Sequence, residues 1–243
     1  MPIRLVIRMC FVYAISWLAA VPGAAQTPTR KVQLLPADAL GSLSWTSLAS
    51  DPKGDGLQAR LPDARELSYA IDSKNDLVWF KVTVYEPLPE RWFGISVAMD
   101  TDDKPDNGMT WWGTNKAKFD LLASAFLFKA EDSWQGYAGV ADSESVGRGD
   151  MTSLTRDVKV ALDREQRAVL LGVPRSALGN APTIRVIATV GSMLANNDDV
   201  PNDGMITVRL KPLTPIKRTL ESLYDLDCSE MPDPSSILRR ELQ

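Results

Sequence analysis

The alternation of apolar and polar side chains over residues 77–85 is the feature that most restricts the fold of this chain. Side chains two positions apart point to the same face of a β-strand. One face would carry Val78, Phe80, Val82 and Val84, and the other Trp79, Lys81, Thr83 and Tyr85. A period of two over this length predicts a strand with a buried face.

Similar short runs follow one another along the chain, separated by turn-forming residues. The sequence predicts strands at 43–48, 66–71, 77–85, 92–99, 119–129, 134–140, 157–162, 168–173, 183–190 and 205–210. Residues 174–179 fit a single helical turn, and 215–226 space apolar residues as a helix does. About nine or ten strands with so little helix predict an all-β fold, an antiparallel β-sandwich with a short C-terminal helix.

Residues 1–25 have the pattern of an export signal. Arg4 and Arg8 precede an apolar run at 9–20, which small residues follow at 21–26. That run is shorter than the roughly 20 residues of a membrane span. We therefore expect a periplasmic or secreted protein without a membrane span after cleavage. Its sandwich would occupy 26–212, and a helix and tail 213–243.

Charge and composition exclude several classes of function. The net charge of −4 argues against nucleic acid as a partner. Histidine is absent, which removes Ser-His-Asp catalysis and His-ligated zinc. Cys10 lies in the signal, so Cys228 is the one cysteine of the exported chain and no internal disulfide forms. Cys228 is either a bystander in the tail or a contact to a partner.

Two octets nearly repeat each other, DDKPDNGM at 102–109 and DDVPNDGM at 198–205. Pro and Gly favour turns, and clustered carboxylates and amides offer the oxygen ligands that calcium prefers. The candidate ligands are Asp100, Asp102, Asp103, Asp106, Asn107, Asp198, Asp199 and Asp203. Asp51 and Asp55 would join them if their loop lies at the same end of the sandwich. The competing interpretation is that both octets are ordinary solvated turns.

Paired tryptophans follow the first octet directly. Proteins bind sugars by stacking an indole on the apolar face of the ring while polar side chains bond to its hydroxyls. Trp111, Trp112, Asn115 and Lys116 therefore form a candidate saccharide site. In an extended segment at most one of the two indoles would belong to the core.

Four segments, in order, carry a family resemblance. They are DPKGD at 51–55 followed by Asp63, VAMDTD at 97–102, VPRSALG at 173–179 and DVPNDG at 199–204. This order resembles the secreted DOMON-like and family 9 carbohydrate-binding-module-like sandwiches over residues 43–210. The resemblance implies a β-sandwich that binds sugars, haem or calcium, or an accessory domain.

We therefore expect a non-catalytic binding or accessory module for a saccharide or cell-envelope glycan, with calcium on its acidic loops. One alternative is a haem-binding electron-transfer module, although the lack of histidine disfavours haem. Its iron ligands would come from Met99, Met109, Met151, Met193 or Met205 with Lys116 or Lys118. Another is a structural cell-envelope protein. A glycosidase with paired carboxylates also stays open.

Overall fold

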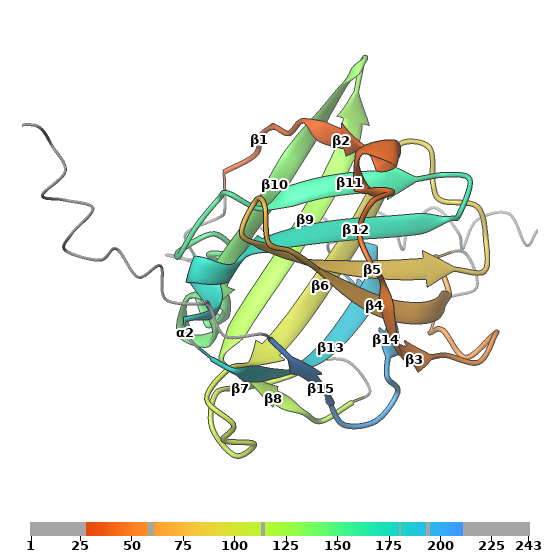
Figure 1. Cartoon of the computed structure of the whole chain (residues 1–243). Coiled ribbons are helices and arrows are strands. Elements are labelled where there is room, and N and C mark those ends of the chain that lie inside the picture. The colour runs from red at the N-terminus through yellow and green to blue at the C-terminus, as the bar shows by residue number, and fades with distance from the viewer. Residues whose placement is uncertain (1–27, 58–60, 113–114, 180, 193–194, 211–243) are drawn as a thin grey trace, which may run out of the picture. The chain divides into compact units, whose positions relative to one another are not determined.

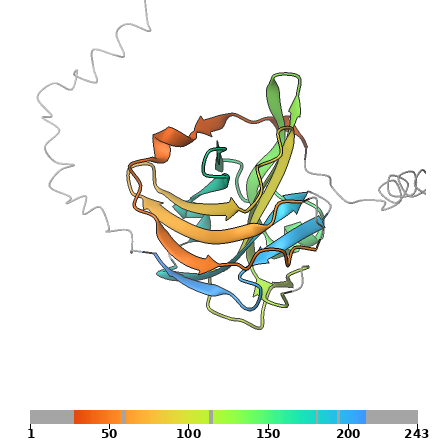
Figure 2. The ribbon, with the colours of Figure 1, turned by 90° about the vertical axis from the view of Figure 1, so that its right-hand side faces the viewer.

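Two β-sheets packed face to face form the body of the protein (Figures 1 and 2). The computed structural model describes residues 28–57, 61–112, 115–179, 181–192 and 195–210. The predicted signal segment, C-terminal helix and tail, with Cys228, lie outside these residues. Among the described residues, no helix has the length and apolar character needed to cross a bilayer.

Sheet A has seven strands. In spatial order they are β1 (Arg30–Lys31), β10 (Ser133–Asp142), β9 (Leu121–Ala130), β6 (Trp92–Asp100), β13 (Thr183–Ser192) and β14 (Ala195–Val200), with β15 (Ile206–Arg209) also paired to β13. All of these pairs are antiparallel. The strands predicted at 119–129 and 134–140 are present as the antiparallel pair β9 and β10.

Sheet B has six strands. Their order is β2 (Leu34–Pro36), β11 (Lys159–Asp163), β12 (Ala168–Pro174), β5 (Leu77–Val84), β4 (Ala64–Asp72) and β3 (Thr46–Ser50). Only β2 and β11 pair in parallel within this sheet. A separate two-stranded ribbon joins β7 (Met109–Thr110) to β8 (Lys118–Phe119). The prediction of an all-β sandwich is confirmed.

The main core lies between the two sheets. The face of β5 predicted to be buried, which includes Phe80 and Val82, packs there against Ile95 and Val97 of β6. Adjacent side chains on β5 alternate between this core and the outer face of sheet B. Apolar burial of this kind stabilises a fold by about 25 cal/mol per Å², so the alternation determines which face of each sheet turns inward.

The outer face of sheet B is also covered. The 3₁₀-helix η2 (Ala37–Leu40) and the segment after it bring Leu40 and Trp45 onto Trp79. Gly172 lies beneath the Trp79 ring, where a Cβ atom would stand 2.9 Å from ring carbons. The outer side of β5, which carries Trp79, therefore packs in a second, smaller core instead of facing solvent.

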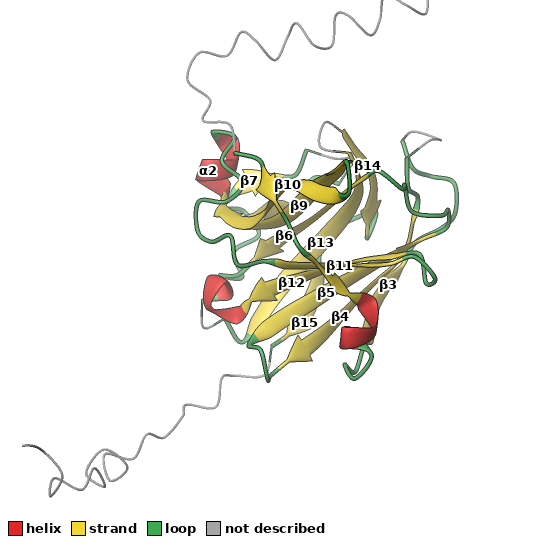
Figure 3. Ribbon diagram, turned by 90° about the horizontal axis from the view of Figure 1, so that it is seen from above, coloured by secondary structure: helices red, strands yellow, loops and turns green. Residues whose placement is uncertain are grey.

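A third apolar cluster covers the outer face of sheet A and positions the candidate site. Trp111, directly after β7, and Phe119 of β8 pack on Leu122 and Ile187. Val146 of helix α2 (Ser143–Gly147) closes the cluster, and Figure 3 shows α2 beside β7 and β10. Gly108 permits this arrangement, because its φ is +79° and a Cβ there would lie 2.1 Å from the Phe119 carbonyl oxygen.

The second octet differs from the prediction. It was expected to be a loop throughout, but its first three residues belong to β14, and the turn begins only at Pro201, after a cis peptide bond. The strand places Asp198 and Asp199 at buried positions instead of on a solvated loop. The short 3₁₀-helix η3 (Arg175–Leu178) falls where a single helical turn was expected.

Candidate functional site

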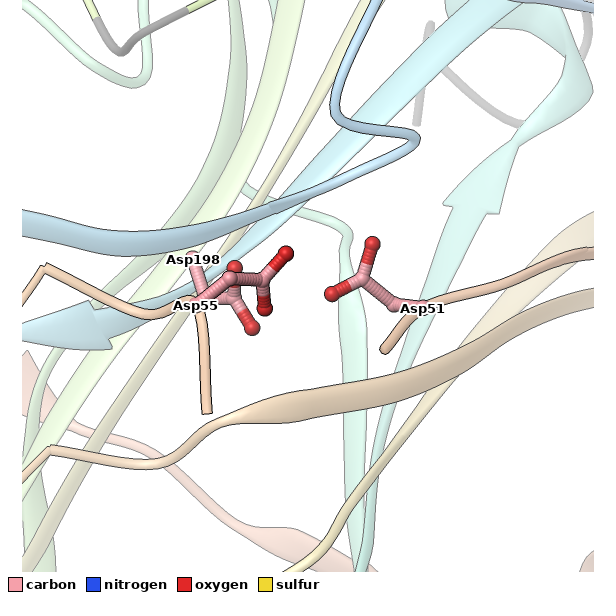
Figure 4. A group of neighbouring side chains, drawn as sticks. All are labelled: Asp51, Asp55 and Asp198. Atoms are coloured by element: carbon pink, nitrogen blue, oxygen red, sulfur yellow. The ribbon is translucent and has the colours of Figure 1, made fainter. Parts of the chain in front are cut away.

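Three carboxylates from separate parts of the chain meet where β14 passes the edge of sheet B. Asp51 directly follows β3, Asp55 lies four residues further on, and Asp198 comes from β14. One carboxylate oxygen of each lies within 4.8 Å of the others. Figure 4 shows the three side chains turned toward one another. These three residues are called the aspartate cluster below.

Backbone bonds hold the cluster in position. Asp51 donates its N–H to the Arg65 carbonyl oxygen at 2.9 Å and accepts the Tyr85 hydroxyl at its own carbonyl oxygen at 2.7 Å. Asp198 Oδ2 accepts the Ala64 N–H at 2.6 Å. Because Ala64 begins β4 of sheet B, this last bond joins the two sheets at the cluster.

Two amide groups donate hydrogen bonds here, one to the aspartate cluster and one to the neighbouring Asp63. The Asn202 side-chain nitrogen donates to Asp51 Oδ1 at 3.0 Å and to Asp55 Oδ2 at 2.8 Å. The Gly54 N–H donates to Oδ2 of Asp63, a fourth carboxylate, itself buried, which is close enough to act electrostatically on Asp51 and Asp198. The turn of the second octet and the early 51–55 loop are therefore neighbours, as the sequence had left open.

The electrostatics of the cluster are unfavourable for ionised carboxylates. Burial, followed by repulsion from Asp55 and Asp63, raises the pKa of Asp51 to about 7. Burial also raises the pKa of Asp198 to about 8, against the Ala64 hydrogen bond and with a further contribution from the neighbouring carboxylates Asp51, Asp55 and Asp63. Within the described part of the chain, no lysine or arginine forms an ion pair with Asp51, Asp55 or Asp198.

Two buried oxygens lack a hydrogen-bond donor. Asp51 is 5 % exposed and Asp63 7 % exposed, and among the described residues neither Asp51 Oδ2 nor Asp63 Oδ1 has a hydrogen-bond partner. An unpaired buried charge costs considerable free energy. Hard divalent cations such as calcium and magnesium take oxygen ligands of this kind. The aspartate cluster can therefore offer ligands to a metal ion.

The first octet lies beside a second acidic group, Asp100, Asp102 and Asp120. Here bases and donors already compensate the charge. Arg185 forms ion pairs with Asp100 and, at 3.6 Å, with Asp103. Hydrogen bonds from Lys104 and Asn107 lower the pKa of Asp102. This second group can also offer metal ligands, but its carboxylates already have cationic and hydrogen-bonding partners.

The other predicted metal ligands belong to neither of these three-carboxylate groups. Asp103, Asp106 and Asp203 are exposed. Asn107 bonds to Asp102 at 2.8 Å, inside its own turn. Asp199, next to Asp198, points to the other side of β14 and accepts a hydrogen bond from Trp111. Of the predicted set, the three-carboxylate groups contain Asp198 in one and Asp100 with Asp102 in the other.

Trp111 and Trp112 differ in exposure, although both follow β7 and Trp112 lies in a bend rather than in an extended segment. Trp111 is 1 % exposed and Trp112 is 43 % exposed. Their rings nevertheless stack, with centroids 4.7 Å apart and planes at 22°. Phe119 meets both indoles edge-on. Trp112 is thus a partly exposed aromatic ring supported from below by a buried one.

The two polar residues predicted beside them differ in role. Asn115 is buried, and its side chain is used inside the protein: Nδ2 donates to the carbonyl oxygens of Pro201 and Gly204, at 3.3 and 2.7 Å, and Oδ1 accepts from Ala117 N–H. Asn115 therefore joins two loops and does not face a ligand. Lys116 is exposed on the same loop.

The methionines considered as iron ligands pack as apolar side chains. Met99 is fully buried between the sheets. Met109, Met151 and Met205 pack on the third apolar cluster, on the opposite face of sheet A. Met193 lies outside the described residues. The sulfur atoms are thus divided between two faces of one sheet.

Sequence reasoning missed Asp120 and gave Asp63 no ligand role. Asp120 sits between β8 and β9 and accepts the Thr101 N–H and hydroxyl. Its position at the start of a strand beside the first octet was the available signal. No protein-family model matches this chain, and no curated protein is significantly similar to it.

Proposed function

We propose that this protein is a non-catalytic β-sandwich binding module that holds a divalent cation, calcium, at the aspartate cluster. One observation carries the proposal: three carboxylates, two of them buried, converge within 4.8 Å, and among the described residues the buried Asp51 Oδ2 has no hydrogen-bond donor. A cation would replace mutual repulsion by coordination. Mass action would then convert its binding free energy into stability of the fold.

The donor set favours calcium. Its members are carboxylate oxygens, which suit hard cations, whereas softer transition metals favour imidazole or thiolate ligands. Calcium accepts 6–8 oxygens in flexible geometry, but magnesium requires a near-ideal octahedron. Asp51 and Asp198 are buried and Asp55 is exposed. The cation would therefore have protein oxygens on its inner side and water or a ligand oxygen on its outer side.

The same cluster supports catalysis less well. A glycosidase pairs one protonated and one ionised carboxyl on the two sides of a scissile bond. Asp51 and Asp198 are 5 % and 4 % exposed and lie among further carboxylates. Such burial favours an enclosed ion over a polymeric substrate between the two acids.

Trp112 supports a saccharide as the ligand of the module. Its ring is 43 % exposed and lies flat on Trp111, which fixes the plane that a sugar ring would stack on. Lys116 is exposed on the same loop, four residues after Trp112. The export-like residues 1–25 support a periplasmic or secreted location, where the partner would be a cell-envelope glycan.

Calorimetric titration with calcium tests the cation site. Protein treated with EDTA and dialysed should bind about one calcium ion, since the cluster presents a single set of converging ligands. Asp51→Asn should abolish binding, because it removes a negative ligand. Asp106→Asn removes the same charge from an exposed position of the first octet and serves as the matched control, with unchanged binding.

Two results would refute the cation site. One is the absence of any heat of binding when millimolar calcium is added at pH 8. The other is equal loss of binding in Asp51→Asn and Asp106→Asn, which would indicate a diffuse charge effect. Titration of Trp112→Ala against a panel of glycans tests the saccharide separately, and an affinity equal to wild type would remove Trp112 from the site.

A further inference from the structure

The turn of the second octet is fastened at both sides. On one side Asn202 donates to Asp51 and Asp55. On the other, Asn115 donates to the carbonyl oxygens of Pro201 and Gly204. Asn115 lies three residues after Trp112 in the segment between β7 and β8. The turn at 201–204 therefore links the aspartate cluster to the loop that carries Trp112.

A second connection runs through β14. Asp198 and Asp199 are consecutive, so their side chains leave opposite faces of the strand. Asp198 enters the aspartate cluster, while Asp199 Oδ2 accepts the Trp111 indole N–H at 3.0 Å. Trp111 in turn stacks on Trp112 at 4.7 Å. A change in the position of β14 at the cluster would therefore act on the indole beneath Trp112.

We propose that cation binding at the aspartate cluster sets the position of the Trp112 ring, so that ligand binding at Trp112 is cation-dependent although Trp112 is not a cation ligand. The proposal rests on the cation site described above. It adds a coupling between two sites on opposite faces of β14.

The physical reason is the balance of forces at the cluster. Without a cation, repulsion among Asp51, Asp55 and Asp198 acts against the Asn202 bonds that hold the turn. A bound cation removes that repulsion and stabilises one position of β14 and the turn. Coupling between two sites is reciprocal, so a ligand on Trp112 would tighten cation binding by the factor by which the cation tightens the ligand, roughly 5–150-fold in typical cases.

Fluorine NMR of the full chain labelled with 5-fluorotryptophan tests this coupling with calcium alone. The Trp112 resonance is assigned by its absence in Trp112→Phe. Calcium should shift this resonance along the binding curve measured by calorimetry. The Trp134 resonance is the internal control. Trp134 lies at the start of β10, where its ring packs against Phe93, so calcium should not shift its resonance.

Trp111→Phe isolates the connection. It keeps an aromatic ring beneath Trp112 but removes the N–H that bonds to Asp199. We expect it to bind calcium with wild-type affinity and to show a much smaller calcium-dependent shift at Trp112. The wild-type titration decides the question even if this variant does not fold.

The outcomes separate the two proposals. Calcium binding by calorimetry with a static Trp112 resonance would overturn the coupling and leave the cation site intact. An equal shift in wild type and Trp111→Phe would overturn the Asp199–Trp111 connection. A protein that binds no calcium would overturn the cation site, and the coupling with it.

Discussion

Asn202 bonds to Asp51 across 151 positions of sequence, with its side-chain nitrogen 3.0 Å from Asp51 Oδ1. The same nitrogen reaches Asp55 Oδ2 at 2.8 Å. A neutral amide thus supplies hydrogen-bond donors between two carboxylates that would otherwise face each other. The turn of the second octet is thereby tied to the early loop by the chemistry of the candidate site.

Replacing this amide by a carboxylate should destabilise the cation-free protein without weakening cation binding. Asn202→Asp adds a negative charge and removes both donated bonds, so the cation-free protein should unfold at a lower temperature at pH 8. A hydrogen bond to a charged partner contributes about 1.5–3 kcal/mol, which sets the scale of the loss. Calcium should restore the melting temperature to at least the calcium-bound wild-type value.

Thermal unfolding of both proteins in EDTA and in calcium provides the measurement. Asn202→Ser is the control, because it removes the amide without adding charge. It should lose stability in EDTA and recover less with calcium than Asn202→Asp. Equal recovery of the two variants would show that the added carboxylate does not reach the ion.

Asp198→Asn should stabilise the cation-free protein. Asparagine can still accept the Ala64 N–H, but it no longer repels Asp51 and Asp55. At pH 8 we expect a higher melting temperature in EDTA, and near pH 5, where the buried acid is already protonated, little change. The variant should also lose its response to calcium. Lower stability than wild type at both pH values would contradict the proposed repulsion.

Calcium itself should raise the melting temperature of the wild type. At a free concentration of 100 times the dissociation constant, a single-site ligand adds about 2.7 kcal/mol. For a domain of this size that corresponds to a rise of about 5–10 °C. Differential scanning fluorimetry with calcium, with magnesium and with EDTA measures it. Equal rises with magnesium and calcium would contradict the selectivity inferred from the donor set.

The stability of the cation-free protein should fall as pH rises. Asp51 and Asp198 have folded-state pKa values raised to about 7 and about 8, from an ordinary value of 3.8. Between these limits the folded state binds more protons than the unfolded state, so the free energy of unfolding decreases with increasing pH. The decrease should extend from about pH 4 to about pH 8.

Saturating calcium should flatten or reverse this slope, because a coordinating carboxylate must be ionised. Calcium affinity should therefore increase from pH 6 to pH 8. Chemical unfolding at several pH values, with EDTA and with calcium, measures both trends. A cation-free protein as stable at pH 8 as at pH 5 would show that the cluster does not carry the inferred repulsion.

Long strands were predictable from the sequence, and short or polar ones were not. β5, β6 and β13 alternate or run apolar because each packs on the core between the sheets, and this burial leaves a periodic signal. The ribbon strands β7 and β8 have two residues each, too few to show a period. β14 has the sequence ANNDDV, which local preference assigns to a loop. Its acids are accommodated because Ala64 and Trp111 donate to them.

The sequence predicted the type of site, but it did not predict which residues come together to form it. Asp and Asn with Pro and Gly indicated oxygen-ligand loops, and the early loop was recognised as a possible partner. The sequence could not show that Asp51 meets Asp198, because their contact depends on how β14 passes the edge of sheet B. Nor could it show that Arg185, far from the first octet in sequence, neutralises Asp100. The two octets have similar sequences, and what makes their environments different is the residues that contact them from elsewhere in the fold.

Arg185 should therefore be essential for stability at the first octet and irrelevant to calcium at the aspartate cluster. Asp100 is 2 % exposed, and Arg185 pairs with it. Removing one member of a buried ion pair costs about 3–5 kcal/mol, because the remaining charge stays buried and uncompensated. Arg185→Gln should lower the free energy of unfolding by that order in urea, with calcium affinity unchanged. Arg185→Gln combined with Asp100→Asn should recover most of the loss, since neither charge is then buried alone. If the single variant instead gains a second calcium ion at Asp100, Asp102 and Asp120, then Arg185 is what keeps the first octet from binding metal.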